Sequence, residues 1–352
     1  MEIITDPEVY EYHKNDIDCD LFVLAEGFED RAYHFLLNNN FSKEAYCIAF
    51  NYKNSVVQNE VIHKKYKNKI TQKFSNNRIY SVMIDSDDPR DLDKTLHDKL
   101  EKIPGFQGKV WFDISGFPSY AICMVLRLLR LSYPTLVFNI IYTAAKEYSP
   151  SKAQYKKLLN KQREGVDFLP SSMAVDMNEI FIPESFSGHR TRDGSNCLVV
   201  FAGYDSPRSS GVINDMNPSM LLLLYGLPGD ERFYWRHDLS KQLHKRFETT
   251  RNTATEDVST LNPKEALDRI EEYYEYLFDD YDVTVSPVCS KMQSVAAYLF
   301  WERYNEVQLV FPLPIGYDYD RRPKGVAKTY CFSVSPRALL FRNRDNDQVN
   351  SV

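Results

Sequence analysis

Two short segments place small hydroxyl residues where an apolar run ends and a helical pattern begins. They are Asp113-Ile-Ser-Gly-Phe-Pro-Ser119 and Val285-Ser-Pro-Val-Cys-Ser-Lys291. Free N–H groups at a helix N-terminus attract anions, and glycine lets a ligand approach the backbone closely. The alternative is that the serines only cap helices, which serine does well. We expect an anionic ligand to contact Ser115, Gly116, Ser119, Ser286, Ser290 and Lys291.

Two arginines follow a glycine at the end of an apolar run. Arg31 comes after Gly27 and Arg208 after Gly203, each with an acidic residue close by in the chain. Arginine can bind a phosphate through two parallel N–H groups, but it can also pair with the neighbouring acid. The sequence therefore predicts that Arg31 and Arg208 bind the ligand, with local ion pairs as the alternative. Neither segment contains the GxGxxG fingerprint of dinucleotide-binding folds.

Aromatic and basic residues alternate after the last long apolar run, between residues 317 and 324. Tyrosine rings stack on bases, and arginine neutralises phosphates, so Tyr317 and Arg321 are further candidate ligand contacts. His237 and His244 lie seven residues apart in a basic stretch. A catalytic histidine is conceivable there, but we expect a solvated basic helix.

Acidic residues at three expected strand ends suggest an enzymatic alternative. Glu29, Asp85 and Asp113 could converge and bind Mg²⁺ through their carboxylates, which would suit phosphodiester chemistry. The alternative for the acids next to Pro89 is helix capping. We expect no metal and no cofactor, and the catalytic residues, if there are any, stay unknown.

The Asp113–Ser119 and Val285–Lys291 segments resemble the motif after the fourth strand of CARF-type sensor domains. That motif places an acid, a Ser/Thr-Gly and a Ser/Thr-Lys after a central strand. The chain departs from it at Tyr120, where the motif has lysine, and at Val285 and Pro287. CARF domains are Rossmann-like and work in pairs, and SAVED domains resemble two such units in one chain. The resemblance implies an oligonucleotide second messenger bound between the two halves.

The pattern of apolar runs predicts strands that alternate with helices, and therefore parallel sheets. The expected strands of the first half are 21–25, 45–50, 79–84, 109–114 and 136–143. The second half repeats the pattern at 197–202, 220–225, around 258, 283–286 and 307–313, with 329–334 as a closing edge strand.

Matching intervals indicate that the halves are duplicated. Ser115 precedes Tyr148 by 33 residues, and Ser286 precedes Tyr319 by the same interval. A shared strand–helix rhythm in any two α/β halves is the alternative explanation. We predict an α/β fold of two Rossmann-like parallel-sheet halves related by internal duplication. Their expected bounds are 1–150 and 197–340, with a connecting segment at 151–196 and a tail at 341–352.

Composition limits the possible functions. The chain has 352 residues, 43% of them hydrophobic, and a net charge of −6. The negative charge argues against a broad duplex-DNA surface. No apolar run approaches a membrane span, the N-terminus does not look like a signal peptide, and the six cysteines form no CxxC pair. We expect a cytoplasmic protein with no membrane contact.

These observations favour a nucleotide- or oligonucleotide-binding sensor or regulatory protein, in a prokaryotic antiviral defence system, with its effector on a separate chain. The alternatives are a metal-dependent enzyme acting on nucleotides or nucleic acid, and a non-catalytic structural subunit of a defence complex. The acids of the candidate site (Glu29, Asp85 and Asp113) fall in the first half and most cations in the second. We therefore expect the two halves to have different roles.

Overall fold

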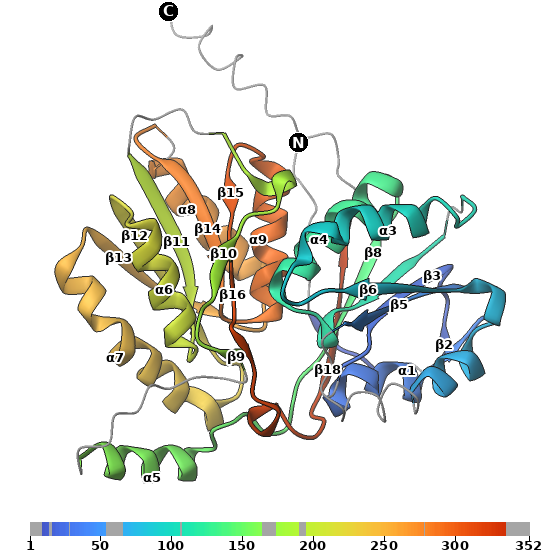
Figure 1. The fold of residues 1–352 in the computed structure, drawn as a ribbon, viewed down its shortest axis with the longest axis horizontal. Coiled ribbons are helices and arrows are strands. Elements are labelled where there is room, and N and C mark those ends of the chain that lie inside the picture. Colours follow the sequence, from blue (N-terminus) through green and yellow to red (C-terminus); the bar gives the residue numbers. More distant parts are fainter. Residues whose placement is uncertain are drawn as a thin grey trace, which may run out of the picture.

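Two parallel β-sheets, one in each half of the chain, form the frame of the protein (Figure 1). The computed structural model describes residues 9–13, 16–27, 29–53, 66–105, 108–163, 174–189, 195–277 and 279–335. The parallel part of the first sheet has the order β6-β5-β3-β7-β8, with β3 Leu21–Ala25, β5 Tyr46–Tyr52, β6 Ile79–Ile84, β7 Val110–Asp113 and β8 Phe138–Thr143. The second sheet has the order β13-β12-β11-β14-β15, with β11 Asn196–Ala202, β12 Met220–Leu227, β13 Thr253–Ser259, β14 Asp282–Pro287 and β15 Gln308–Leu309.

Both sheets therefore follow the same strand order. Counted along each half, it is third, second, first, fourth, fifth, which is the order of Rossmann-type folds. The central strands β3, β7 and β11 are buried on both faces because helices cover both sides of each sheet, whereas the edge strands β6 and β13 carry exposed side chains. The predicted α/β class with two Rossmann-like parallel sheets is confirmed, whereas the internal duplication stays a prediction.

The last described strand crosses back to the first half. β18 (Thr329–Val334) runs antiparallel to β8, and β1 (Tyr10–Glu11) pairs with its outer edge. The expectation that residues 329–334 close the second half is wrong. β18 thus extends the first sheet beyond β8. Its successive residues Cys331 and Phe332, which point to opposite faces of the sheet, are both fully buried. The proposed domain bounds at 150 and 197 remain a prediction, but β18 belongs to the first sheet.

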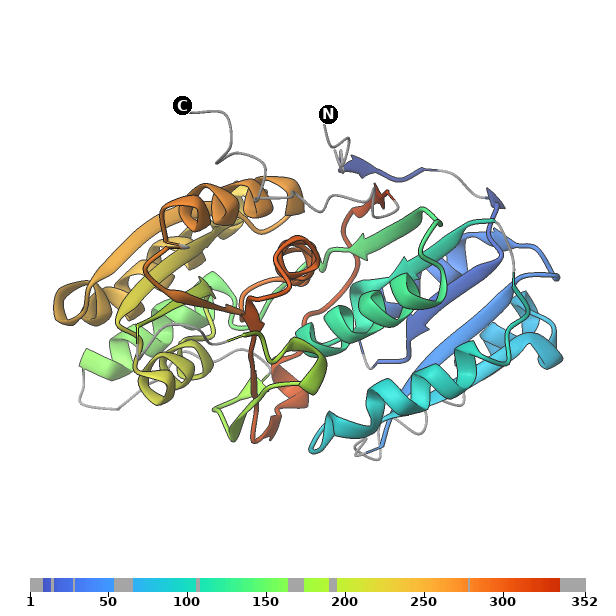
Figure 2. The same cartoon turned by 90° about the horizontal axis from the view of Figure 1, so that it is seen from above.

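Two long helices lie side by side between the sheets, as Figures 1 and 2 both show. They are α4 (Ser119–Ser132) and α9 (Lys291–Arg303), and they are flanked by α3 (Leu92–Leu100) and α8 (Pro263–Leu277). The opposite faces carry α1 (His34–Asn38) on the first sheet and α6 (Ser206–Met216) and α7 (Tyr234–Thr250) on the second. One hydrophobic core contains the inner faces of both sheets and the four central helices.

Strand periodicity accounts for that shared core. In β3, Leu21 and Val23 face the central layer while Phe22 and Leu24 face α1, as expected when successive side chains alternate between faces. A buried ion pair also joins the halves, between Arg130 of α4 and Glu302 of α9, at 3.1 Å. We therefore expect the two halves to unfold together.

The connection between the halves contains α5 (Lys152–Arg163) and two short strands. β9 (Ala174–Val175) pairs with β17 (Gly316–Tyr317), and β10 (Glu179–Phe181) pairs with β16 (Phe311–Leu313). The expected tail at 341–352 lies outside the described residues. Among the helices of the described residues, none is long and apolar enough to cross a membrane.

Candidate functional site

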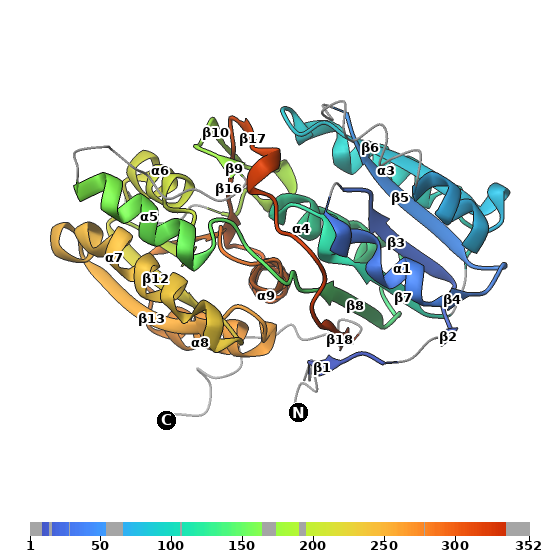
Figure 3. The same cartoon turned by 90° about the horizontal axis from the view of Figure 1, so that it is seen from below.

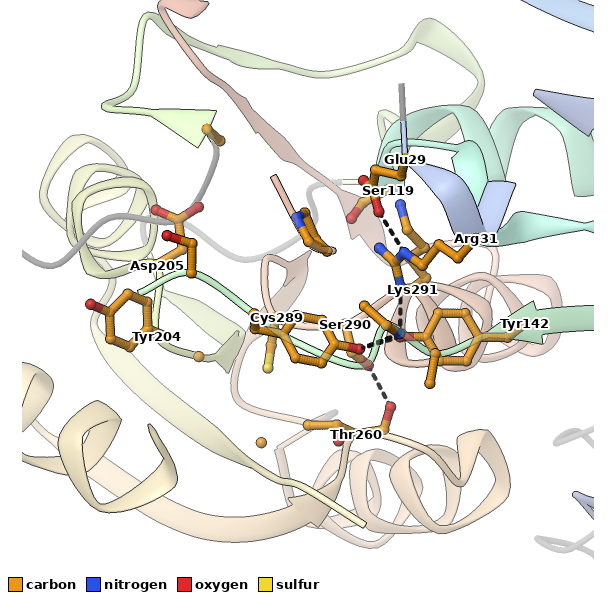
Figure 4. A pocket seen from close by; sticks show the side chains of 18 of the residues that line it. Glu29, Arg31, Ser119, Tyr142, Tyr204, Asp205, Thr260, Cys289, Ser290 and Lys291 are labelled. Carbon is orange, nitrogen blue, oxygen red and sulfur yellow. Dashed lines mark hydrogen bonds and ion pairs between the residues drawn. The ribbon is translucent and has the colours of Figure 1, made fainter. Parts of the chain in front are cut away.

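The carboxyl ends of both sheets face one pocket of about 590 Å³ (Figure 4). In each sheet the first strand lies between the second and the fourth, so the connections leave it in opposite directions. Such a switch point leaves a crevice at the strand ends, where open α/β sheets bind their ligands. Here the two crevices open toward each other. Figure 3 shows the segment that contains β17 passing between the halves, and Gly316 and Tyr317 of this strand line the pocket.

Most of the predicted contact residues line this pocket. They are Arg31, Gly116, Ser119, Arg208, Ser290, Lys291, Tyr317 and Arg321, together with Glu29. Two predicted residues do not line it, because Ser115 and Ser286 are fully buried. The Ser115 hydroxyl instead accepts a hydrogen bond of 2.8 Å from the backbone N–H of Thr143, which fixes the loop to the end of β8. Ligand contact at all of these positions remains a prediction.

Matching ion pairs lie at the ends of the two first strands. Arg31 donates to Glu29 and also to the hydroxyl of Tyr142 at 3.1 Å, while Arg208 donates to Asp205 at 2.7 Å. Burial disfavours the charge of Arg31, but Glu29 and neighbouring tyrosines raise its pKa above the ordinary value. Local ion pairs, the alternative considered for these arginines, are therefore what the structure shows.

Lys291, the first residue of α9, faces the pocket without a carboxylate of its own. Its ammonium group donates to the carbonyl oxygen of Phe117, just before α4. Burial, and then the positive charge of Arg31, lower its pKa from 10.5 to about 8. Within the described part of the chain it forms no ion pair.

Arg236, in the first turn of α7, is a second such cation. It donates to the carbonyl oxygen of Pro150 at 3.1 Å, and its guanidinium lies 4.1 Å from the ring centroid of Tyr204. Burial lowers its pKa below the ordinary value. Among the described residues no carboxylate forms an ion pair with it.

Aromatic rings connect the two sides of the pocket. The hydroxyls of Tyr142 and Tyr148 are 3.3 Å apart, and the ring of Tyr148 meets Phe233 edge-on at 5.3 Å between centroids. Burial raises the pKa of Tyr204 to about 12 and also raises that of Tyr142, so both stay neutral near pH 7. The pocket thus combines flat rings, neutral hydroxyls and cations.

Ser290 shows that helix capping accounts for part of the predicted motif. Its hydroxyl accepts from the N–H of Gln293 at 3.1 Å, and its own N–H donates to the side-chain oxygen of Gln293 at 3.2 Å, which together form a capping box on α9. The same hydroxyl donates to the carbonyl oxygen of Thr260 at 2.9 Å. Ser119 makes no such cap on α4. Figure 4 shows Ser119 beside Glu29, Arg31 and Lys291. Of the two helix-start serines, Ser119 is therefore the one not committed to capping.

Two glycines in the loops are required by close packing. A side chain on Gly116 would come within 2.5 Å of the carbonyl oxygen of Ala25, at the end of β3. A side chain on Gly203 would meet the sulfur of Cys289 at 2.7 Å. The loops that carry the predicted contacts thus pack directly on the first strand of each sheet. All six cysteines are free thiols.

The acidic residues do not converge. Asp85 pairs with Lys53 at 2.8 Å and lies outside the pocket lining, while Asp113 is 1% exposed beneath it. Burial raises the pKa of Asp113 to about 7. Among the described residues, no group of three or more His, Cys, Asp or Glu side chains could hold a metal ion.

The expectation of a solvated basic helix at His237 and His244 is wrong, since both are buried. His244 Nδ1 contacts the carbonyl oxygen of Ser240 at 2.8 Å, and its Nε2 lies 2.6 Å from the hydroxyl of Ser209. The carbonyl can only accept, so Nδ1 carries the proton and Nε2 accepts from Ser209. These contacts join α6 to α7 behind the pocket and leave neither nitrogen of His244 available for catalysis.

Sequence reasoning missed Tyr148, Tyr204, Phe233 and Arg236 as pocket residues. Tyr148 and Tyr204 each follow an expected strand, and a position after the carboxyl end of a strand is the sequence signal that could have identified them as pocket residues. The role of Arg236 depends on the start of α7 meeting residues 149 and 150, which local sequence does not reveal.

No protein-family model matches the chain, and no curated protein matches it. Among solved structures, it is similar to the N-domain of a bacterial malonyl-CoA reductase with NADP. The two share 9% identity over 81% of this chain and 80% of that one, with a TM-score of 0.22. A likeness of this degree supports no conclusion about ligands, and the CARF and SAVED resemblance stays a prediction.

Proposed function

We propose that the protein binds a nucleotide-class ligand, a nucleotide or short oligonucleotide, in the pocket between its two halves. It acts there as a sensor or regulatory protein rather than by chemistry on the ligand. The observation that carries the proposal is the pair of cations, Lys291 and Arg236, that face one pocket and form no ion pair with a carboxylate of the residues that the structure describes. A partly buried, unpaired cation is unfavourable until an anion neutralises it.

The rest of the lining limits which anion fits. Tyr148, Tyr204 and Phe233 offer ring faces and edges near Arg236, while Ser119 and Gly116 lie near Lys291 at the start of α4. Phosphates suit the cations and the free N–H groups of the helix, and bases suit the rings. A ligand that carries both groups uses more of the pocket than inorganic phosphate does.

Isothermal titration calorimetry tests this proposal. The probes are inorganic phosphate, adenosine, the ribonucleoside mono- and triphosphates, and linear and cyclic di- to tetranucleotides. We expect at least one phosphorylated probe to bind, and Lys291→Met and Arg236→Met each to weaken it by about tenfold or more. Lys102→Met is the matched control, because Lys102 is exposed and lies outside the pocket. Failure of every probe to bind the folded protein, or binding by both pocket variants with the affinity of the wild type, would overturn the proposal.

The role in prokaryotic antiviral defence and the separate effector protein are finer parts of the proposal. They are motivated by the CARF-like segments at Asp113–Ser119 and Val285–Lys291. Copurification of a stoichiometric partner whose activity changes when the probe binds would support them. The metal-dependent enzyme has no specific support, because Glu29, Asp85 and Asp113 each make a separate contact and form no metal-holding group among the described residues. A pocket that binds no probe, in a chain held in a stable complex, would favour the structural-subunit alternative.

A further inference from the structure

Helix α5 has an unusual charge for this chain. Its twelve residues, Lys152–Arg163, contain five cations and no carboxylate, although the whole protein has a net charge of −6. Lys152, Lys156 and Lys157 are exposed, and within the described residues none of them forms an ion pair. Like charges one turn apart on a helix repel each other. An acidic partner would therefore stabilise this basic face, defined as Lys152, Lys156 and Lys157.

The chain itself contains a complementary surface. The end of α8 and the following turn expose Glu272, Glu275, Tyr276, Asp279 and Asp280, which we call the acidic end. Tyr276 is 83% exposed at its centre. No ion pair forms at Asp279 or Asp280 within the described part of the chain. Tyrosine is enriched in protein interfaces, and the carboxylates around Tyr276 complement a positively charged partner.

These two surfaces lie at opposite edges of the second half. α5 begins shortly after residues 144–149, which line the pocket at the carboxyl ends of the strands. α8 runs the other way, and its end leads into the first residue of β14, at the amino ends of the strands. Figure 1 accordingly shows α5 at the lower edge of the molecule, well away from α8. The two surfaces of one molecule therefore cannot meet.

We propose that the basic face of α5 docks on the acidic end of α8 in a second copy of this chain. The contact joins two different surfaces, so each copy leaves one of them open for the next. The product is a head-to-tail assembly, and its formation depends on ionic strength because both surfaces are charged. A nucleic acid is a poorer occupant, since the basic face is one short helix on an acidic protein.

Sedimentation velocity over a range of protein and salt concentrations tests this assembly. At low ionic strength the average mass is expected to rise with protein concentration above the 41.1 kDa monomer, and to return to it at high salt. Lys156→Glu/Lys157→Glu is expected to weaken self-association by about tenfold or more, and Asp279→Lys/Asp280→Lys to do the same. The chain that carries all four substitutions is expected to regain most of it.

The controls separate specific docking from general charge effects. Lys94→Glu/Lys102→Glu makes the same change in net charge on exposed residues of the first half and is expected to leave association unchanged. All four positions in the two tested surfaces are exposed, so the fold is expected to be retained, which circular dichroism checks. A chain that is monomeric throughout, or association that survives Lys156→Glu/Lys157→Glu, would overturn the proposal. Binding of a single-stranded oligonucleotide at α5 in a monomeric chain would do so as well. None of these outcomes depends on whether the pocket binds a nucleotide.

Discussion

Lys291 destabilises the empty protein, so its replacement by methionine is expected to raise stability while it weakens ligand binding. Its pKa falls from 10.5 to about 8 on folding. A shift of this size corresponds to about 3 kcal/mol of disfavoured charge. Solvent screening at this partly exposed position reduces the free energy by which the charge is disfavoured. The substitution also removes the hydrogen bond to the carbonyl oxygen of Phe117, which costs about 1 kcal/mol. We therefore expect Lys291→Met to gain about 1–2 kcal/mol, or a rise of a few degrees in Tm.

The pH dependence of that gain has a definite sign. Below pH 8 the lysine is protonated in both the folded and the unfolded state, so the unfavourable charge is fully present in the folded protein. Between pH 8 and 10.5 the unfolded chain binds more protons than the folded one, and stability rises with pH. The difference in Tm between Lys291→Met and wild type is therefore expected to shrink as pH rises from 8 toward 10.5. Comparing the two proteins cancels the groups that do not interact with Lys291, whereas Asp113, whose pKa of about 7 the lysine lowers, adds a pH dependence of its own near neutral pH.

Differential scanning fluorimetry with and without the best-binding phosphorylated probe measures both effects. The ligand-induced rise in Tm is expected to be clearly smaller in Lys291→Met than in wild type, because no cation is left there to neutralise the anion. Lys102→Met, which removes an exposed charge outside the pocket, is expected to match wild type in both respects. A Lys291→Met variant that is less stable than wild type below pH 8, and that keeps the full ligand-induced shift, would refute this reasoning.

Three further substitutions test the frame that supports the pocket. Burial raises the pKa of Asp113 from 3.8 to about 7, so the folded protein loses stability as pH rises through 7. Urea unfolding is therefore expected to show that Asp113→Asn is more stable than wild type by up to about 4 kcal/mol at pH 8 and by little at pH 4. Glu302→Ala leaves Arg130 buried without its partner and is expected to cost about 3–5 kcal/mol in a single unfolding transition; separate transitions for the two halves would contradict the shared core. Gly116→Ala places a methyl group 2.5 Å from the carbonyl oxygen that ends β3 and is expected to lower stability by about 1–3 kcal/mol, whereas Gly105→Ala, with nothing within 4 Å, serves as the control in thermal melts.

The central strands were predictable because parallel strands buried on both faces read as continuous apolar runs, and the edge strand β6 because its alternating apolar residues bury one face. Leu21–Ala25 and Ile79–Ile84 were predicted with the bounds that the structure gives them. The sheet that β18 joins was not predictable, because its apolar pattern suits an edge of either sheet. Only its pairing with β8, from Thr329 opposite Thr143 to Val334 opposite Phe138, decides the matter.

The position of the candidate site was predictable for a similar reason. The carboxyl ends of parallel strands gather at one edge, so the sequence alone predicts that Arg31 and Lys291 lie there. Which of these groups is neutralised was not predictable. Arg31 pairs with Glu29 two residues away, whereas Arg236 donates to the carbonyl oxygen of Pro150 across the boundary between the halves and lies against the ring of Tyr204 in its own half. That difference depends on tertiary contacts, and it decides which cations can attract a ligand.

The two halves divide the pocket chemistry differently from the sequence expectation. Each half contributes one Arg–carboxylate pair, Arg31 with Glu29 and Arg208 with Asp205, and these pairs add little net charge. Within the described part of the chain, the two pocket cations without a carboxylate partner, Lys291 and Arg236, both come from the second half, while Tyr142 and Tyr148 of the first half supply hydroxyls and rings.

Anionic groups are therefore drawn mainly to the second half, and a flat ring can lie against the first. Under the proposed function, a ligand that carries both groups would span the boundary and hold the start of α7 and the loop after β8 in one arrangement. Its binding energy would then act on the packing between the halves, which is the property that a sensor needs.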